Sequence, residues 1–278
     1  DILTYGMGER ASVEILSRLA SGTPVEEITD VRGTCVAARH PGVCAYPKVE
    51  VPSFEEVATD KAAYARANMT EYLEHDAVVG RAILQKHGDR FLIVNPPAAP
   101  LTTPEMDRVA ELPYVREPHP MYDEMGGVPA IEEVRFSVTH NRGCFGACNF
   151  CSLAFHQGRI ITSRSHESVL REVAALTHHP GFKGYIHDVG GPAATFRRPS
   201  CQKQLKHGMC KNRACLAPEP CPNLDADHTD YMMLLRKLRA IPGIKKVFIR
   251  SGIRFDFLMK DPSGEFFTDL VQHHISGQ

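Results

Sequence analysis

Residues 134–151 read VRFSVTHNRGCFGACNFC and join a short apolar run to a loop that holds three cysteines. The run from Val134 to Thr139 predicts a β-strand. Cys144, Cys148 and Cys151 follow almost at once, in the spacing C-x3-C-x2-C. Because the loops after the strands of parallel α/β folds usually carry the chemistry, this loop is the first candidate functional site.

The residues after this loop predict alternating helices and strands. In chain order we expect a helix capped by Ser165 that runs to about Leu176, a strand over 184–189, a helix over about 228–240, a strand over 246–250, and a helix opened by Asp261-Pro262 that reaches His273. This order favours parallel strands. Three strands cannot close a barrel, so the chain is expected to stop where a fourth strand should begin.

The residues before the loop predict a separate α/β layer. The opening 1–22 (DILTYGMGERASVEILSRLASG) indicates a strand, a glycine turn and an amphipathic helix. The turn has the composition of a phosphate cradle, but simple packing is the better interpretation. Short strands and turns are expected over 23–60, and a helix over about 54–87 that is broken at most once.

Prolines divide the chain further on. Those between 96 and 120 rule out a continuous helix there and indicate an ordered connector that ends near Gly126-Gly127. We therefore expect two parts. Residues 1–125 would form an N-terminal α/β region with this connector, and residues 126–278 would form the core with a cysteine-rich insertion over 197–224.

The composition is that of an ordinary globular protein. The 278 residues are 43% hydrophobic and 23% charged, with a formal net charge of -1, so no global attraction to nucleic acid or membrane is implied. No stretch has the length and apolarity of a membrane span or of a secretory signal. The chain begins Asp1-Ile2-Leu3 without Met, which leads us to expect a fragment.

The chain contains nine cysteines. Their number is odd, and a chain of this length does not depend on disulfides for its core, so a disulfide framework is not expected. Seven fall into two compact groups, which favours metal binding in a reducing cytosol and hence a cytoplasmic location. Cys35 and Cys44 lie outside both groups and are expected to be buried.

Three thiolates at the spacing of the first group can bind one face of a [4Fe–4S] cluster and leave one iron open. A structural zinc ion would instead need a fourth ligand, which His140 or His156 is placed to supply. A third interpretation is that the cysteines are unrelated buried thiols.

The spacing C-x3-C-x2-C, with Phe150 just before the last cysteine, resembles the signature of the radical S-adenosylmethionine (SAM) superfamily. The resemblance implies that Cys144, Cys148 and Cys151 ligate a [4Fe–4S] cluster whose fourth iron chelates SAM. It also implies that Phe150 lies near the adenine and that SAM is cleaved to a 5′-deoxyadenosyl radical. The implied partners are a reductant, such as flavodoxin or ferredoxin, and a substrate that the sequence does not identify.

Further positions are similar to SAM-binding positions of that superfamily. Gly190-Gly191 match its glycine motif, although Pro192 stands where a Glu is often found; a plain turn at the strand end is the alternative. Ser251 and Arg254 follow the third strand and would reach SAM or substrate, or else pair with the backbone or with Asp256. His187 and Asp188 also end a strand at this face, with either a substrate contact or a structural role.

The resemblance narrows to the uncharacterised YgiQ-type branch through GMGERA, NPPAAPLT, LPYVREPHPMY, NRGCFGACNFCSLAFHQGR, HDVGGPAA, CPNLDADH and FIRSGIRFD. These motifs span nearly the whole chain. Members are longer at both ends, which implies that this chain holds about half of a (β/α)6 barrel and that residues 1 to about 30 are the tail of a cobalamin-domain-like region. No D-x-H-x-x-G run supports cobalamin binding here, and a truncated barrel is expected to lose activity. The chain also lacks G-x-S-x-G, P-loop and H-E-x-x-H motifs, so nothing indicates a hydrolase, NTPase or metalloprotease.

The second cysteine group comprises Cys201, Cys210, Cys215 and Cys221. Its loop lacks apolar periodicity, so a metal would stabilise it, either zinc or an auxiliary iron–sulfur cluster; reduced thiols or disulfides are the alternative. The same loop is basic, through Arg197, Arg198, Lys203, Lys206, Lys211 and Arg213. Without interleaved aromatic residues a solvated face is favoured over RNA binding. The runner-up to the enzyme is therefore a non-enzymatic metal-stapled module that binds RNA.

Overall fold

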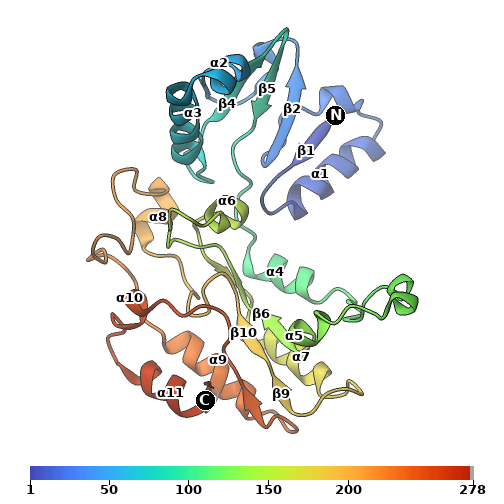
Figure 1. Ribbon diagram of the computed structural model, residues 1–278, viewed down its shortest axis with the longest axis vertical. Helices are drawn as coiled ribbons and strands as arrows, with labels where there is room; N and C mark the ends of the chain where they lie inside the picture. The colour runs from blue at the N-terminus through green and yellow to red at the C-terminus, as the bar shows by residue number, and fades with distance from the viewer. Residues whose placement is uncertain (276–278) are drawn as a thin grey trace. The chain divides into compact units, whose positions relative to one another are not determined.

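The computed structural model describes residues 1–275 and has the mixed α/β fold that the sequence predicts (Figure 1). The chain forms two compact units. The first unit contains Asp1–Pro100, Phe145–Ile160 and Gln202–Arg213. The second unit contains Leu101–Cys144, Ile161–Cys201 and the described residues from Ala214 onward. The domain boundary expected between residues 125 and 126 stays a prediction.

The first unit is built on a five-stranded sheet in the order β1-β2-β5-β4-β3. Its strands are β1 (Ile2–Thr4), β2 (Thr34–Ala38), β3 (Lys48–Glu50), β4 (Ala82–His87) and β5 (Arg90–Val94). All neighbours are antiparallel except β3 and β4, which run parallel. Because β1 and β5 are both antiparallel to β2, their carboxyl ends lie at the same edge of the sheet.

Helices α1 (Glu9–Ala20), α2 (Phe54–Thr59), α3 (Lys61–Glu74), α6 (Leu153–Gln157) and α8 (Gln202–His207) complete this unit, with 3-10 turns η1 (Val25–Glu27) and η2 (Pro41–Val43). The opening strand, glycine turn and helix are confirmed by β1 and α1. On one face, Val36, Leu84 and Ile93 of the three central strands pack together. On α3, Ala67 packs against Ile83 of β4.

The helix expected over residues 54–87 is wrong in its last third. Asp60 has extended backbone, and its side chain accepts a hydrogen bond from the backbone of Ala62 at 2.8 Å, so one helix ends and another begins there. After α3 ends, residues 82–87 form β4 instead. This apolar run pairs with β3 on one side and β5 on the other, and such distant pairing overrides a local helical pattern.

The second unit holds the parallel strands that the sequence predicts. Strand β6 (Ser137–Thr139) pairs in parallel with β10 (Asp188–Gly190), and β9 (Tyr185–Ile186) pairs in parallel with β11 (Lys246–Val247). Only His187 separates β9 from β10, so these two strands act as one central strand between β6 and β11. A short antiparallel pair, β7 (Asn141–Arg142) with β8 (Thr162–Ser163), follows β6.

Helices complete the second unit. They are α4 (Thr103–Ala110), α5 (Ile131–Val134), α7 (His166–Leu176), α9 (Thr229–Arg239), α10 (Phe255–Leu258) and α11 (Glu265–His273), with the 3-10 helix η3 (Pro120–Met125). One apolar core includes Val173 of α7, Leu235 of α9, Phe266 of α11, and Val189 and Val247 of the strands. Ser165 caps α7 as expected, because its hydroxyl accepts a hydrogen bond from the backbone of Ser168 at 3.1 Å.

The proline-rich connector contains one helix, α4, that the sequence did not predict. Pro104 stands in the first turn of α4, where its missing N–H is harmless, and Thr102 and Glu105 form a capping box. The side chain of Asp107 accepts a hydrogen bond from the backbone of Ser165 at 2.9 Å and so joins α4 to the start of α7.

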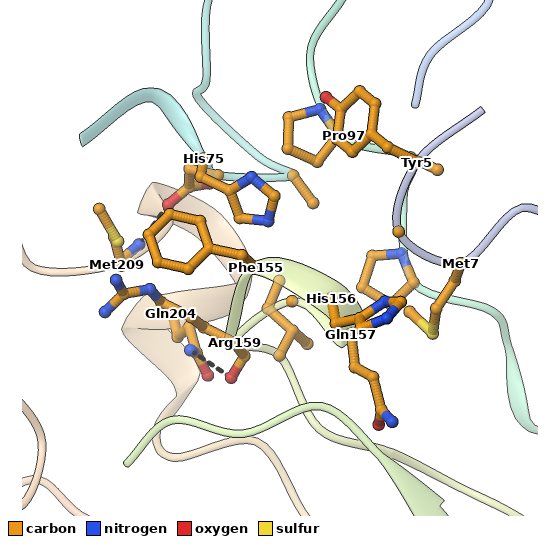
Figure 2. A pocket seen from close by; sticks show the side chains of 17 residues that line it. Tyr5, Met7, His75, Pro97, Phe155, His156, Gln157, Arg159, Gln204 and Met209 are labelled. Atoms are coloured by element: carbon orange, nitrogen blue, oxygen red, sulfur yellow. Dashed lines mark hydrogen bonds between the residues drawn. The ribbon is translucent and has the colours of Figure 1, made fainter. Parts of the chain in front are cut away.

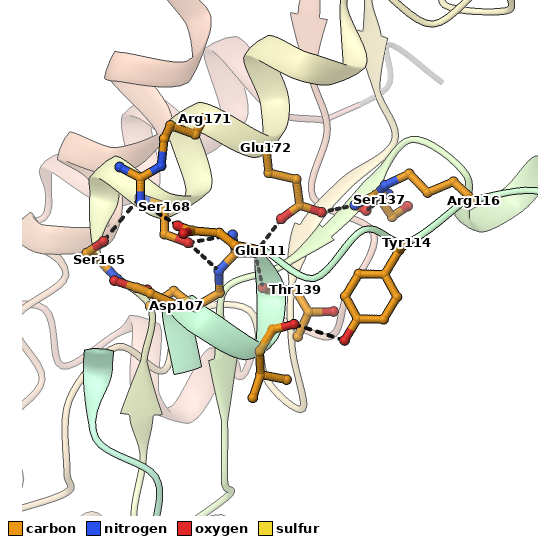
Figure 3. A network of polar contacts seen from close by, with 12 residues as sticks. Asp107, Glu111, Tyr114, Arg116, Ser137, Thr139, Ser165, Ser168, Arg171 and Glu172 are labelled. Atoms are coloured by element: carbon orange, nitrogen blue, oxygen red, sulfur yellow. Dashed lines mark hydrogen bonds and ion pairs between the residues drawn. The ribbon is translucent and has the colours of Figure 1, made fainter. Parts of the chain in front are cut away.

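Ion pairs extend this junction (Figure 3). Glu172 of α7 binds both Arg116 and Arg164, and Arg171 binds Glu111. Burial lowers the pKa of Arg164 to about 10, and because that value lies well above neutral pH, this guanidinium stays charged. From residue 101 onward, the connector is therefore an ordered part of the second unit.

Within residues 1–275, none of the helices combines the length and apolar composition that crossing a bilayer requires.

The core of the second unit predicts the effect of truncating α9. Leu235→Ala should lower the free energy of unfolding by about 2–5 kcal/mol, because Leu235 is fully buried among apolar side chains and the change leaves a cavity. Met233→Ala is the matched control, since Met233 lies on the same helix and is 41% exposed. Urea unfolding followed by circular dichroism measures both. Equal effects of the two substitutions would contradict this core.

Candidate metal and cofactor site

The carboxyl ends of the parallel strands gather polar and glycine residues in the second unit. Because β6 and β10 are parallel and in register from Ser137↔Asp188 to Thr139↔Gly190, the residues after both strands emerge at one edge. His140 and Asn141 follow β6, and Gly191 follows β10. Residues Arg250 and Ser251 come shortly after β11 and meet this same edge through hydrogen bonds.

Asp188 makes those hydrogen bonds. Its Oδ1 accepts the backbone N–H groups of Arg250 at 2.8 Å and Ser251 at 3.1 Å. The Ser251 hydroxyl donates to the other carboxylate oxygen, Oδ2. The carboxylate therefore fixes the segment after β11 against the end of the central strand. Of the two roles that the sequence left open for Asp188, the structure shows the structural one.

Gly190 and Gly191 sit where no side chain fits. A Cβ on Gly190 would lie 1.9 Å from the hydroxyl oxygen of Ser251 and 2.3 Å from Oδ2 of Asp188. A Cβ on Gly191 would lie 1.9 Å from Oδ1 of Asn141. Neither glycine has a positive φ, so the requirement is one of space. The backbone at the end of β10 is thus bare and closely held by its neighbours.

Asn141 is a residue of this edge that sequence reasoning missed. Its side chain is fully buried, and neither its amide nitrogen nor its amide oxygen has a hydrogen-bond partner in the structure. Most buried polar groups have a hydrogen-bond partner. The unpaired amide of Asn141 beside Gly191 is therefore a position where a bound polar group would supply the missing hydrogen bonds. The only sequence signal was its position three residues before the first cysteine.

His140 was weighed as a zinc ligand, but both of its ring nitrogens have other partners. Nε2 lies 2.9 Å from the carbonyl oxygen of Ala194, and Nδ1 lies 3.3 Å from the guanidinium of Arg197. Burial, and then the nearby charge of Arg197, hold the pKa of His140 well below its usual value. Arg197 also donates to Asp230 at 2.7 Å. His140 is therefore a neutral, hydrogen-bonded core residue.

The three-cysteine loop follows this edge directly. Cys144 groups with the second unit, whereas Cys148 and Cys151 group with the first. Gly143 and Ala147 have positive φ values of 91° and 50°, and the backbone N–H of Cys151 bonds to the carbonyl of Cys148 at 3.0 Å, so the loop is tightly turned. All three thiols are half-buried. Phe150 is 92% exposed, whereas Phe145, between the first two cysteines, is buried.

No three His, Cys, Asp or Glu side chains of the described residues stand close enough together to hold one metal ion. The four cysteines of the second group are half-buried thiols, and the backbone of Cys221 bonds to that of Cys215 at 2.8 Å. The structure thus gives a second metal no support. In an iron–sulfur cluster each thiolate binds a different iron, so the absence of a site for a single metal ion among the described residues does not test the first group. The assignment of Cys144, Cys148 and Cys151 to a cluster therefore stays a prediction.

Two other candidate residues have side-chain partners. Ser251 donates to Asp188, and Arg254 donates to both oxygens of Asp256 at 3.0 and 2.5 Å. The pairing of Arg254 with Asp256 is one that the sequence weighed against a cofactor contact, whereas the partner of Ser251 was not anticipated. At His187, by contrast, the ring nitrogen Nδ1 is buried and has no partner in the structure.

The basic stretch from Arg197 to Arg213 is partly neutralised by acids from elsewhere in the chain. Arg197 pairs with Asp230, and Arg198 pairs with Asp227 at 3.0 Å. Lys211 lies 3.8 Å from Glu74. The stretch is therefore less positive than its own sequence suggests, which weakens the RNA-binding alternative.

Comparison with known proteins finds a matching family model and similar relatives. Residues 1–137 match the family model described as radical SAM N-terminal. UPF0313 proteins of Clostridium botulinum and Clostridium perfringens are 52% and 47% identical to this chain over 278 residues. These matches cover the whole of this chain but only 43% and 42% of the two relatives, so the chain spans less than half of their length.

The close approach at Gly191 predicts a steric cost. Gly191→Ala should lower the free energy of unfolding by about 1–3 kcal/mol, because the new methyl group would overlap the Asn141 amide. Gly252→Ala is the matched control, since a Cβ there meets nothing within 4 Å. Thermal melting of both variants measures the difference. A Gly191→Ala variant as stable as the Gly252→Ala variant would contradict the close approach.

The buried state of His140 predicts how stability depends on pH. Its pKa is lower in the folded chain than in the unfolded chain, so the folded state binds fewer protons. The stabilisation is complete above the unfolded pKa of about 6.5 and is lost as the pH falls below it. The free energy of unfolding in urea should therefore drop between about pH 7.5 and about pH 5.5. His140→Asn should reduce that drop, whereas substitution of the exposed His40 should leave it unchanged.

Proposed function

Because the chain belongs to the UPF0313 family of the radical SAM superfamily, we propose that its parent protein is an iron–sulfur enzyme that reductively cleaves SAM to a 5′-deoxyadenosyl radical. One observation carries the proposal: a C-x3-C-x2-C loop follows a parallel strand whose neighbour ends in two glycines with no room for a Cβ. Since the chain spans 43% of its relatives' length, the proposal concerns the whole protein.

The residues fit the cofactors of this reaction. Cys144, Cys148 and Cys151 offer three thiolates, the number that leaves one iron of a [4Fe–4S] cluster open. When bound, the cluster supplies the electron that breaks the sulfonium bond of SAM. The backbone has positive φ at Gly143 and Ala147, within the short loop that carries all three cysteines.

The bare backbone of Gly190 and Gly191 is the proposed seat of the amino-acid part of SAM. A ligand can approach backbone N–H and C=O groups closely where no Cβ intervenes. The unpaired amide of Asn141 lies against Gly191, which adds an orphaned buried polar group to the same place. Asp188 has the supporting role, because it holds the neighbouring segment in position through its hydrogen bonds.

Phe150 is the proposed contact for the adenine. Its ring is 92% exposed, so both ring faces are open to stack on a planar base. Ser251 and Arg254 remain proposed contacts to SAM or substrate. The Ser251 hydroxyl can still accept a hydrogen bond while it donates to Asp188, and Asp256 orients the guanidinium of Arg254.

The wider context is also proposed. Residues 126–278 would form about half of a (β/α)6 barrel, and residues 1 to about 30 the tail of a cobalamin-domain-like region. A flavodoxin or ferredoxin would donate the electron in the cytoplasm, where thiols stay reduced. A zinc ion or auxiliary cluster at Cys201, Cys210, Cys215 and Cys221 stays a prediction without structural support.

Removing one thiolate tests the cluster assignment. Cys144→Ala in anaerobically purified protein should lose most of its iron and its brown colour, because two thiolates hold a cluster poorly. The same substitution in the full-length parent should abolish release of 5′-deoxyadenosine from SAM under reducing conditions. Cys44→Ala is the matched control, since Cys44 is a half-buried thiol outside both groups and should keep both properties.

The opposite results would be decisive. A colourless wild-type chain that contains zinc alone would contradict the enzyme proposal for these residues. A brown Cys144→Ala variant with undiminished iron would contradict the ligand assignment.

A further inference from the structure

The first unit contains a narrow, partly open cavity that shares Tyr5, His75 and Phe155 with a wider one of about 560 Å³, a volume within the usual range of about 300–1,000 Å³ for small-molecule sites (Figure 2). It is lined by residues from stretches far apart in the sequence, among them Tyr5 after β1, His75 after α3, Pro97 after β5 and Phe155 of α6. Because β1 and β5 end at the same edge of the sheet, the segments that follow them bring Tyr5 and Pro97 to the same cavity.

Aromatic rings form one wall of the cavity. The ring centroid of His75 lies 5.1 Å from that of Phe155 and 6.1 Å from that of Tyr5. Tyr72 packs against the edge of Phe155 at 5.9 Å and so supports it from behind. Figure 2 shows His75 and Phe155 side by side at the cavity. Phe155 remains 37% exposed, which leaves part of its ring surface open.

This wall carries no charge at neutral pH. Burial, and then the positive charge of Arg159, lower the pKa of His75 below its usual value. A neutral imidazole next to two aromatic rings offers a surface on which a flat ring can stack.

The charged groups that line the cavity are one acid and one base. The carboxylate of Asp76 is already used: Oδ1 accepts the backbone N–H of Val78 at 2.7 Å, and Oδ2 accepts that of Met209 at 2.6 Å. The guanidinium of Arg159 lies 4.4 Å from the ring centroid of Tyr72, and its Nε–H is buried without a hydrogen-bond partner. Among the residues that line the cavity, the carboxylate of Asp76 is therefore occupied, and the Nε–H of Arg159 is a donor without a partner.

We propose that this cavity binds a neutral, planar nitrogen heterocycle of nucleobase size, which stacks on His75 and Phe155 and accepts a hydrogen bond from Arg159. A wider cavity shares Tyr5, His75 and Phe155 with this one and gives room for a substituent on the heterocycle. The site is distinct from the proposed SAM site, because none of the three cysteines, Gly190 or Gly191 lines it.

The test uses 2-aminopurine, a neutral fluorescent purine whose emission is quenched when it stacks on aromatic rings. The chain has no Trp, so the probe is read without tryptophan background. The whole chain should quench the probe saturably. Phe155→Ala should weaken binding about tenfold, because the stacking surface is lost. Arg159→Gln should also weaken it. Tyr64→Ala is the matched control and should bind like wild type, since Tyr64 is 59% exposed and lines neither cavity.

Phe155→Leu keeps the apolar volume without the ring, and it replaces the alanine variant if that variant fails to fold by thermal melting. The proposal is overturned if wild type gives no saturable quenching, or if wild type and the Phe155 variants bind equally. Cys144→Ala separates this site from the proposed SAM site, because it should bind the probe normally whatever its iron content. Loss of binding in that variant, or competition by SAM, would place the probe elsewhere and overturn the proposal.

Discussion

The second unit depends on how one carboxylate ties two strand ends together. Asp188 begins β10 and receives hydrogen bonds from the segment that follows β11, including two backbone N–H groups. Without it, those backbone donors would lack a partner at a crowded strand end, which is costly. The same contact brings Ser251 against Gly190 and explains why that position has no room for a Cβ. The bare backbone proposed to seat SAM is therefore a consequence of strand packing.

Local patterns predicted most of this unit. Ser165 caps its helix, residues 184–189 contain β9 and most of β10, and Lys246 opens β11, because each depends on a few neighbouring residues. The spacing of the three cysteines was equally local, so the family could be inferred from the sequence. A loop of this kind holds all its candidate ligands in one short stretch, so the sequence alone reveals them.

Contacts between distant residues were not predictable. Residues 82–87 were expected to be helical, but they lie between β3 and β5, whose pairing no local pattern reveals. Asn141 and Gly191 meet across 50 positions of sequence, and only their packing shows that the amide is orphaned. The aromatic cavity draws Tyr5 and Phe155 together across 150 positions. The strand pairing, the unpaired amide and the cavity each arise from contacts between segments that are distant in the sequence, and no single segment carries a pattern that predicts them.

Charge shows the same limit of local reasoning. From Arg197 to Arg213 the sequence contains no acid, and counted alone this stretch suggests a polyanion partner. Arg197, however, is one member of a buried chain that runs from His140 through Arg197 to Asp230. A guanidinium held in this way, beside a neutral imidazole, is withdrawn from any external ligand. The charge that remains for binding is set by which acids the fold brings near, and here the fold supplies them from both ends of the chain.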